Sequence, residues 1–315
     1  MKIATVTLNP AIDQTVSVDN FQVGIVNRSL STRLDAGGKG VNVASFLADY
    51  GLDVAATGFL GEENVELFER HFARKKIEDC FIRVPGETRV NIKIMDEHNQ
   101  ETTDLNTPGK APSRDDINRL CEQVEALAQS CEWIVLSGKL PPGLPSNFYA
   151  DLIQIIKRKN RLVVLDTSDD ALLEGLKAGP CMIKPNIDEL SQLIGRELSE
   201  LTEVHSSARS LLNEDVQVVV ISMGGDGALF IKENEALLAV PPSVTLKSTV
   251  GAGDAMVAGL VAGSVKNLSL ADCARLATAF SLSAITRVGR DLLAREEIES
   301  YQKQIVITPF EIEQP

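Results

Sequence analysis

The sequence predicts an α/β fold in which helices cover both faces of a mostly parallel sheet. Two observations support this prediction. Short β-branched runs alternate with amphipathic helical stretches along most of the 315 residues, which is the pattern of successive βαβ units. Two of the strand candidates, "WIVLS" and "LVVLD", are almost continuously apolar, as expected for strands that are covered on both faces.

The alternation assigns the elements of this sheet in chain order. The strands are expected at Ile3–Leu8, Val54–Phe59, Trp133–Ser137, Leu162–Asp166, Met182–Pro185 and Val216–Met223. The helices are expected at Val41–Tyr50, Glu63–Lys75, Arg114–Ala128, Ser146–Arg158 and Ile187–Ile194. Because right-handed crossovers bring the carboxyl ends of parallel strands to one edge of the sheet, we expect ligands to bind at that edge.

Two segments lack this alternation. Residues 13–35 and 83–107 are polar and β-branched without a helical period, and the second contains a hairpin that turns around Glu97–Gln100. We interpret them as a small antiparallel sheet that forms a lid inserted into one domain of residues 1–315. A solvent-exposed decoration is the alternative. The lid is preferred because these segments contain the basic residues Arg28, Arg89 and Lys93.

Composition excludes several classes of function. The net charge of −13 and the aromatic content of 4% argue against a nucleic-acid partner, which needs a basic surface or stacking platforms. The five cysteines are scattered without metal-binding spacing, so neither a disulfide framework nor a zinc site is expected. The N-terminus has no signal-peptide pattern and no apolar run is long enough to span a membrane, so we expect a cytoplasmic protein.

The segment "DAGGKGVNVA" joins a lid strand to a helix. Its glycines, Gly37, Gly38 and Gly40, allow the backbone to approach a ligand closely, and the N–H groups at the start of the helix favour an anion. Lys39 adds a positive charge, although the spacing is not that of a Walker A loop. A purely structural glycine turn is the alternative on these residues alone.

Two further glycine turns follow expected strands. In "SGKLPPG", Ser137 ends a strand and Lys139 would stand at the carboxyl edge of the sheet; a rigid structural elbow is the alternative. In "SMGGDGALF", Ser222 is followed by Gly224, Gly225 and Gly227. A hairpin turn and a contact with phosphate or adenosine explain this second segment equally well.

The segment "KPNIDEL" follows a strand and opens a helix. Asn186 is a good N-cap, and Glu189 three residues later completes a capping-box pattern. The functional alternative is that Glu189 holds Mg²⁺, through water, near the phosphates of ATP.

The segment "STVGAGDAMVAG" places a carboxylate beside an anion-binding loop. Gly251, Ala252 and Gly253 would direct successive N–H groups from a helix N-terminus, which forms an anion hole. Asp254 would repel a phosphate there, but it is well placed if it removes a proton from a hydroxyl while the hole stabilises a transferred phosphoryl group. The alternative is that Asp254 only favours the first turn of the helix, worth about 0.3–1 kcal/mol.

Together these motifs resemble the PfkB (ribokinase-like) family of carbohydrate kinases. "GGKGVNVA", with Gly51 and Gly61 at the expected distances, is similar to the first family signature, and "STVGAGDAMVAGLV" to the second. "KPNIDEL" matches the N-x-x-E motif of the family, and the likeness runs from residue 3 to about residue 290. Within the family, "TLNPAID", "PGETRVNIKI" and "LDTSDDAL" are most similar to the group of 1-phosphofructokinases and tagatose-6-phosphate kinases.

The resemblance implies a ribokinase-like fold and a role for each site residue. Asp13 and Asn42 would bind sugar hydroxyls, and Lys39 and Arg89 the sugar phosphate. The remaining contacts with the phosphosugar would come from Gly37, Gly38, Ser137 and Lys139. Contacts with ATP would come from Lys184, Asn186, Ser222, Gly224, Gly225, Gly227, Ser248 and the 251–253 loop. Glu189 would organise Mg²⁺, and Asp254 would be the catalytic base.

The reaction implied is ATP-dependent phosphorylation of fructose 1-phosphate at its 6-hydroxyl. A tagatose-6-phosphate or fructose-6-phosphate kinase is the rival of the same class, and a non-catalytic sensor of sugar phosphate or nucleotide is the rival of another class. One departure bears on the substrate: the family commonly has S-G-S-L-P where this chain has "SGKLPPG", so Lys139 adds charge. A homodimer formed through the strand edges of the lid is also expected.

Overall fold

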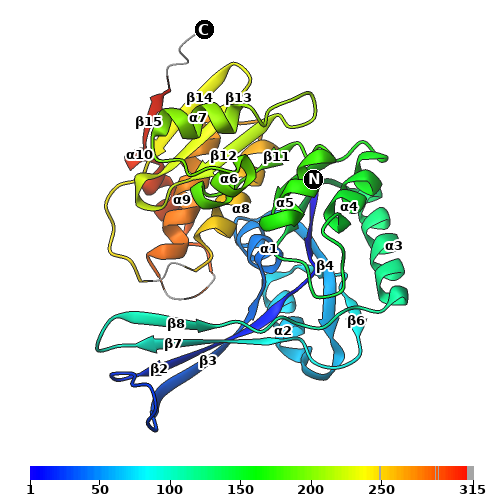
Figure 1. Cartoon of the computed structure of the whole chain (residues 1–315), viewed down its shortest axis with the longest axis vertical. Coiled ribbons are helices and arrows are strands. Elements are labelled where there is room, and N and C mark those ends of the chain that lie inside the picture. The colour runs from blue at the N-terminus through cyan, green and yellow to red at the C-terminus, as the bar shows by residue number, and fades with distance from the viewer. Residues whose placement is uncertain (248–249, 288, 290, 311–315) are drawn as a thin grey trace.

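The computed structural model describes residues 1–247, 250–287, 289 and 291–310. Its central feature is a sheet in the order β15-β14-β13-β12-β11-β10-β9-β1-β4-β5, with β6 paired to β4 (Figure 1). The strands of this sheet are β1 (Lys2–Thr7), β4 (Asp53–Gly61), β5 (Glu78–Asp79), β6 (Ile82–Val84), β9 (Cys131–Ser137), β10 (Leu162–Asp166), β11 (Met182–Ile183), β12 (Val218–Ser222), β13 (Ala228–Lys232), β14 (Glu235–Val240) and β15 (Val306–Pro309).

The sheet is mostly parallel, as predicted. All pairs from β5 to β12 are parallel, and only the three strands at the other edge, β13 to β15, add antiparallel pairs. The expected strand at Leu162–Asp166 has those bounds in the structure, and the other expected strands differ from the observed ones by up to two residues at an end. The carboxyl ends of β1, β9, β10 and β11 therefore lie at a common edge.

Helices cover both faces of the sheet. One apolar cluster contains buried residues of α1, α2, α8, α9 and α10, and the other contains residues of α3 to α7. Alternate residues of one strand enter different clusters: Val164 the first, and Val163 and Leu165 the second. The helices are α1 (Lys39–Asp49), α2 (Glu66–Lys75), α3 (Arg114–Ser130), α4 (Phe148–Lys157), α5 (Asp169–Lys177), α6 (Ile187–Ile194), α7 (Leu201–Arg209), α8 (Ala252–Val265), α9 (Leu270–Ile285) and α10 (Arg295–Gln304).

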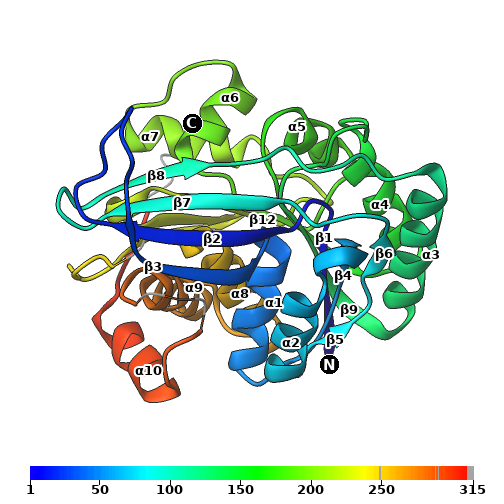
Figure 2. The ribbon, with the colours of Figure 1, turned by 90° about the horizontal axis from the view of Figure 1, so that it is seen from below.

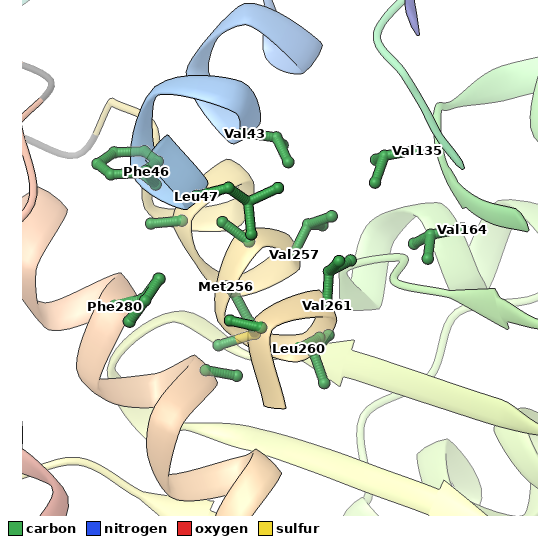
Figure 3. Close-up of a cluster of buried hydrophobic side chains, with 14 of the residues drawn as sticks. Val43, Phe46, Leu47, Val135, Val164, Met256, Val257, Leu260, Val261 and Phe280 are labelled. Atoms are coloured by element: carbon green, nitrogen blue, oxygen red, sulfur yellow. The ribbon is translucent and has the colours of Figure 1, made fainter. Parts of the chain in front are cut away.

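Helix α8 lies at the centre of the first cluster. It is buried from Asp254 to Gly263 and apolar on all sides, as expected for a helix enclosed by others. Figure 3 shows Val43 and Leu47 of α1 beside Val257 of α8, with Phe280 of α9 on the other side. This packing holds the N-terminal turns of α1 and α8 next to each other. No helix in the described part of the chain is both long and apolar enough to cross a membrane.

The two lid segments form a second sheet. Its strands, in the order β3-β2-β7-β8, are β3 (Ser29–Gly37), β2 (Ala11–Val18), β7 (Val90–Asp96) and β8 (Glu101–Leu105). Figure 1 shows these strands below the main sheet, and Figure 2, seen from below, shows the four strands side by side in front of it. The hairpin around residues 97–100 is confirmed as the connection between β7 and β8.

The small antiparallel lid predicted from the sequence contains one parallel pair at its centre. The outer pairs are antiparallel, but β2 and β7 are parallel. The reason lies in the main sheet: the chain enters the lid first after β1 and again after β6, and both strands run parallel to β4, so the chain leaves the same edge of the sheet each time. The predicted lid segment 83–107 also begins in the main sheet, because residues 82–84 form β6 and pair with β4, and its first lid strand starts at Val90.

Candidate active site

The N-terminus of α1 brings two polar side chains to the carboxyl edge of the sheet. Gly38 is the N-cap with φ of 119°, and Lys39 and Asn42 follow within the first turn. A Cβ at Gly40 would lie 2.4 Å from Oγ1 of Thr7, so this glycine lets the helix pack directly on the end of β1. The glycine cluster therefore has a structural role in positioning Lys39 and Asn42.

Asp254 lies in the first turn of α8, only 6% exposed. Asn42 Nδ2 donates a hydrogen bond of 2.7 Å to its Oδ2, and Lys39 Nζ lies 3.7 Å from its Oδ1. Gly251, with φ of 82°, is the N-cap of α8, so residues 251–253 form the start of the helix as expected. A carboxylate and the positive end of a helix dipole thus occupy the same position.

Asp166, at the end of β10, joins these groups to a second lysine. Its Oδ2 accepts hydrogen bonds from Ser137 Oγ at 3.0 Å and Lys39 Nζ at 3.1 Å. Lys184 Nζ lies 3.4 Å from its Oδ1. Sequence reasoning did not select Asp166 as a site residue, although its place at the end of the "LVVLD" strand was the available signal.

The buried charges shift one another's protonation. Burial raises the pKa of the Asp254 carboxyl, and the nearby Asp166 carboxylate adds to this, against the opposing effects of Lys39, Asn42 and Lys184. Burial also disfavours ionisation of Asp166, but attraction to Lys184 and Lys39 outweighs it and holds the pKa of that carboxyl below its usual range. Attraction to Asp166 raises the pKa of Lys39, so this side chain is a cation.

A cleft of about 850 Å³ opens between the lid and the carboxyl edge of the sheet. The predicted substrate-binding residues that line it are Asp13, Gly38, Lys39, Asn42, Arg89 and Lys139. Ser137 and Gly37 are buried and are not among its lining residues; Ser137 bonds to Asp166 instead. Asn91, which was not predicted, lines the cleft and donates a hydrogen bond of 3.1 Å to Asp13 Oδ1 across the lid strands.

The basic residues of the cleft are already bonded to protein groups. The guanidinium of Arg89 donates to the backbone carbonyls of Asn9, Pro10 and Thr107. Lys139 Nζ lies 3.1 Å from Oδ2 of Asp169 in an exposed ion pair. Arg89 therefore ties the lid to the loop after β1, while Lys139 stays at the rim. Arg28 is exposed and is not among the residues that line the cleft.

A second hollow, of about 490 Å³, lies on the other side of the 250–254 segment. It is lined by the predicted residues Ser222, Gly224, Gly225, Gly227, Ala252 and Gly253. The glycine turn joins the antiparallel strands β12 and β13 and also lines this hollow. Its position therefore agrees both with a hairpin turn and with a contact to phosphate or adenosine. A Cβ at Gly227 would lie 2.0 Å from the carbonyl oxygen of Ala239. Ser248 lies outside the described residues.

Asn186 and Glu189 form the predicted capping box at the start of α6. Asn186 Oδ1 accepts from the backbone of Glu189 at 2.7 Å, and Glu189 Oε2 accepts from the backbone of Asn186 at 2.9 Å. Among the described residues, no group of three or more acidic, histidine or cysteine side chains could hold a metal by itself. One carboxylate that supplements phosphate oxygens and waters is, however, a common way to bind Mg²⁺.

The fold and the site together define a kinase that acts on small hydroxyl-bearing molecules, because a buried carboxylate and a helix N-terminus lie between two ligand-sized hollows. Comparison with known proteins makes the class more specific. The chain belongs to the pfkB family of carbohydrate kinases, whose family model matches residues 6–296.

Two relatives, one of them compared through two crystal structures, place the chain within this family. It is 46% identical over 308 residues to the 1-phosphofructokinase of Rhodobacter capsulatus, with 98% of each chain covered. It is 29% identical to phosphofructokinase-2 of Escherichia coli, whose crystal structure with substrates and products matches 96% of this chain and 99% of that one with a TM-score of 0.90. The tetrameric inhibited form of that enzyme is 28% identical over 96% and 98% of the two chains, with a TM-score of 0.88.

Proposed function

We propose that this protein transfers the γ-phosphoryl group of ATP to the 6-hydroxyl of fructose 1-phosphate, which gives fructose 1,6-bisphosphate and ADP. The observation that carries the proposal is the position of Asp254. Asp254 is buried and lines neither hollow itself, but its partners Lys39 and Asn42 line the charged cleft beneath the lid, and its neighbours Ala252 and Gly253 line the hollow beside the glycine turn. An acceptor hydroxyl and a γ-phosphate would meet beside it. The name of the 46% identical relative supports the choice of sugar phosphate.

In the proposed mechanism Asp254 accepts the proton of the acceptor hydroxyl. The oxygen then attacks the γ-phosphorus in line, and the bond to the β-phosphate oxygen of ATP breaks. The backbone N–H groups of residues 251–253 and the ammonium of Lys39 stabilise the charge on the phosphoryl group in transfer. Asn42 holds the Asp254 carboxylate in place through the 2.7 Å hydrogen bond.

Recognition of a sugar phosphate is assigned to the basic side chains of the cleft. Lys39, Arg89, Lys93 and Lys139 all line it, although the chain as a whole carries a net charge of −13. Asp13 would bind a sugar hydroxyl together with Asn91, to which it is bonded. Lys139, in place of the serine usual in the family, would release Asp169 and contact the phosphate.

Mg²⁺ is proposed to bind beside Glu189. The carboxylate uses Oε2 in the capping box, and such a carboxylate can supplement phosphate oxygens and waters around the ion. When bound, Mg²⁺ would neutralise part of the negative charge on the ATP phosphates. Contacts with ATP are proposed as well for Lys184, Asn186 and Ser248, as the resemblance to the family implies.

The lid is proposed to close over the sugar, exclude water and form the interface of a homodimer. Its exposed residues include Leu30, Leu34 and Leu105, apolar side chains that a second copy would cover. Assembly of the E. coli phosphofructokinase-2 into a tetramer shows that a relative self-associates. Residues 1–315 would act as one kinase domain with this lid inserted, and the proposed location is the cytoplasm.

A coupled assay of ADP release tests the substrate. Fructose 1-phosphate, fructose 6-phosphate and tagatose 6-phosphate are compared at matched concentrations with ATP and Mg²⁺. The largest kcat/KM is expected with fructose 1-phosphate. A larger value for either of the others would assign the protein to that activity, and no turnover on any of the three would favour a non-catalytic sensor.

A further inference from the structure

Asp166 is the most enclosed charged group of the site. Its side chain is 1% exposed at the end of β10, and three groups from separate parts of the chain approach it: Ser137 Oγ, Lys39 Nζ and Lys184 Nζ. A carboxylate in such a position is stable only while it is paired, because an unpaired buried charge is costly. Two ammonium groups and one hydroxyl provide that pairing here.

The two lysines that Asp166 holds lie toward different hollows, and Lys39 alone of the two is among their lining residues. The side chain of Lys39 is 38% exposed and lines the cleft beneath the lid, and its Nζ lies 3.7 Å from Oδ1 of the proposed base Asp254. Lys184 is 4% exposed and lies behind Gly253 of the nucleotide hollow, since a Cβ at Gly253 would be 3.3 Å from its Nζ. Asp166 itself is not among the residues that line either hollow.

We propose that Asp166 is a positioning residue that fixes Lys39 and Lys184 on opposite sides of the transfer point and keeps the 3.7 Å ion pair of Lys39 with Asp254 from tightening to a hydrogen-bonded one. This inference rests on the proposed function, in which Asp254 must be free to accept a proton. In this role one buried carboxylate aligns two cations, Lys39 at the sugar phosphate and Lys184 at the nucleotide.

The charges around Asp254 explain why this positioning matters. The groups that face it are Lys39 and Asn42 from α1, Asp166 from the end of β10, and Lys184 from the segment after β11. With Asp166 present, Lys39 is nearer to Asp166 (3.1 Å) than to Asp254 (3.7 Å). Without that competitor, attraction would draw the ammonium to Asp254, and a carboxylate in a direct ion pair is a weaker base.

The variant Asp166→Asn tests this role, because it removes the charge and keeps the shape. We expect kcat to fall about 10- to 1000-fold, since a misplaced catalytic cation and a weaker base both act on the transfer step. We also expect the acid limb of the pH profile of kcat/KM to move to lower pH. Asp254 would lose the repulsion of Asp166 and gain the undivided attraction of Lys39, and both changes favour its ionised form.

Two further variants distinguish the loss of lysine positioning from a general loss of folding stability. Asp116→Asn removes another mostly buried carboxylate, from the capping box of α3, and should lower Tm without moving the acid limb. Asp166→Glu retains the charge and should return the acid limb toward its wild-type position. An acid limb that stays in place in Asp166→Asn would overturn the proposal, and so would a loss of kcat that additional Mg²⁺ alone restores.

A crystal structure of Asp166→Asn provides a readout that does not depend on turnover. We expect Lys39 Nζ to approach Asp254 to within about 3 Å, the distance of a direct ion pair. A Lys39 that stays in place would refute the inference even if the enzyme is active. Failure of the proposed function would show differently, as a wild type that phosphorylates none of the three sugar phosphates.

Discussion

The two hollows on either side of Asp254 are built from different chemistry. The cleft beneath the lid is lined by the charged residues Asp13, Lys39, Arg89, Lys93, Lys139 and Asp169. The hollow beside the glycine turn is lined by glycine, proline, serine and aliphatic residues, and none of these lining residues is charged. The first suits a phosphorylated sugar, which side-chain charges can recognise, and the second suits a nucleoside held by apolar contact and backbone N–H groups.

This difference shows how one protein can separate two anionic ligands. Charged side chains line the cleft in which the sugar phosphate must be oriented. The larger nucleotide would instead fit an uncharged hollow of complementary shape. At the seam between the two hollows, Lys39, Lys184, Asp166 and Asp254 form one cluster of charges. The seam is therefore where a single substitution should have the largest effect.

Asp254→Asn should have that effect. It keeps the hydrogen-bonding shape of the side chain but removes the proton acceptor, so kcat should fall about 10²- to 10⁴-fold while the affinity for ATP changes little. Steady-state kinetics with the preferred sugar phosphate, together with equilibrium titration of ATP, measure both quantities. Activity close to wild type would show that Asp254 is not the base.

Asp272→Asn is the matched control for this substitution. Asp272 occupies the first turn of α9, as Asp254 occupies that of α8, but it is exposed, and its partners within the described residues are Ser269 and Arg275 of its own helix end. If the role of Asp254 were only to favour a helix dipole, both variants would lose about 0.3–1 kcal/mol of stability and nothing more. A large loss of kcat in the α8 variant alone separates the two explanations.

The pH profile of the wild type provides a related prediction. Burial, with Asp166 nearby, raises the pKa of Asp254, so the base becomes protonated at a higher pH than an ordinary aspartate with a pKa of about 3.9. The acid limb of kcat/KM should accordingly lie above that value. The same limb should be absent from the residual activity of Asp254→Asn.

Local patterns were enough to predict the elements that position the site. Hydrophobic alternation located the parallel strands, and glycine clusters located the turns at Gly38 and Gly251, because both signals depend on neighbours in sequence. The capping box of Asn186 and Glu189 was predicted for the same reason. The residues of the second family signature also led directly to Asp254.

Contacts between distant segments could not be predicted in this way. The pairing of Asp166 with Lys39 and Lys184 joins the ends of three elements that only the folded sheet brings together. The parallel β2/β7 pair and the bond from Asn91 to Asp13 depend on the order in which the chain enters the lid. Arg89 was predicted as a phosphate ligand, but its hydrogen bonds to backbone carbonyls need three-dimensional information.

Arg89→Ala tests the charged side of the comparison. The KM for the sugar phosphate should rise about 10- to 100-fold, because the substitution removes charged hydrogen bonds worth about 1.5–3 kcal/mol and loosens the lid from the loop after β1. The KM for ATP should stay near the wild-type value. Arg33→Ala, an exposed lid arginine paired with Asp35, is the control and should change neither constant. An unchanged sugar KM in Arg89→Ala would remove Arg89 from the substrate site.

Leu246→Asp tests the uncharged side, and its effect should be the smallest. Leu246 lines the second hollow but is 60% exposed, so the substitution should not disturb the core. A carboxylate there would repel the nucleotide phosphates with about 1 kcal/mol in hydrated surroundings, which raises the KM for ATP about 3- to 10-fold. Leu173→Asp supplies the same charge at an exposed position of α5 that is not among the lining residues of either hollow. If the KM for the sugar phosphate rose instead, the assignment of the two hollows would have to be exchanged, because the added charge would then be acting on the acceptor.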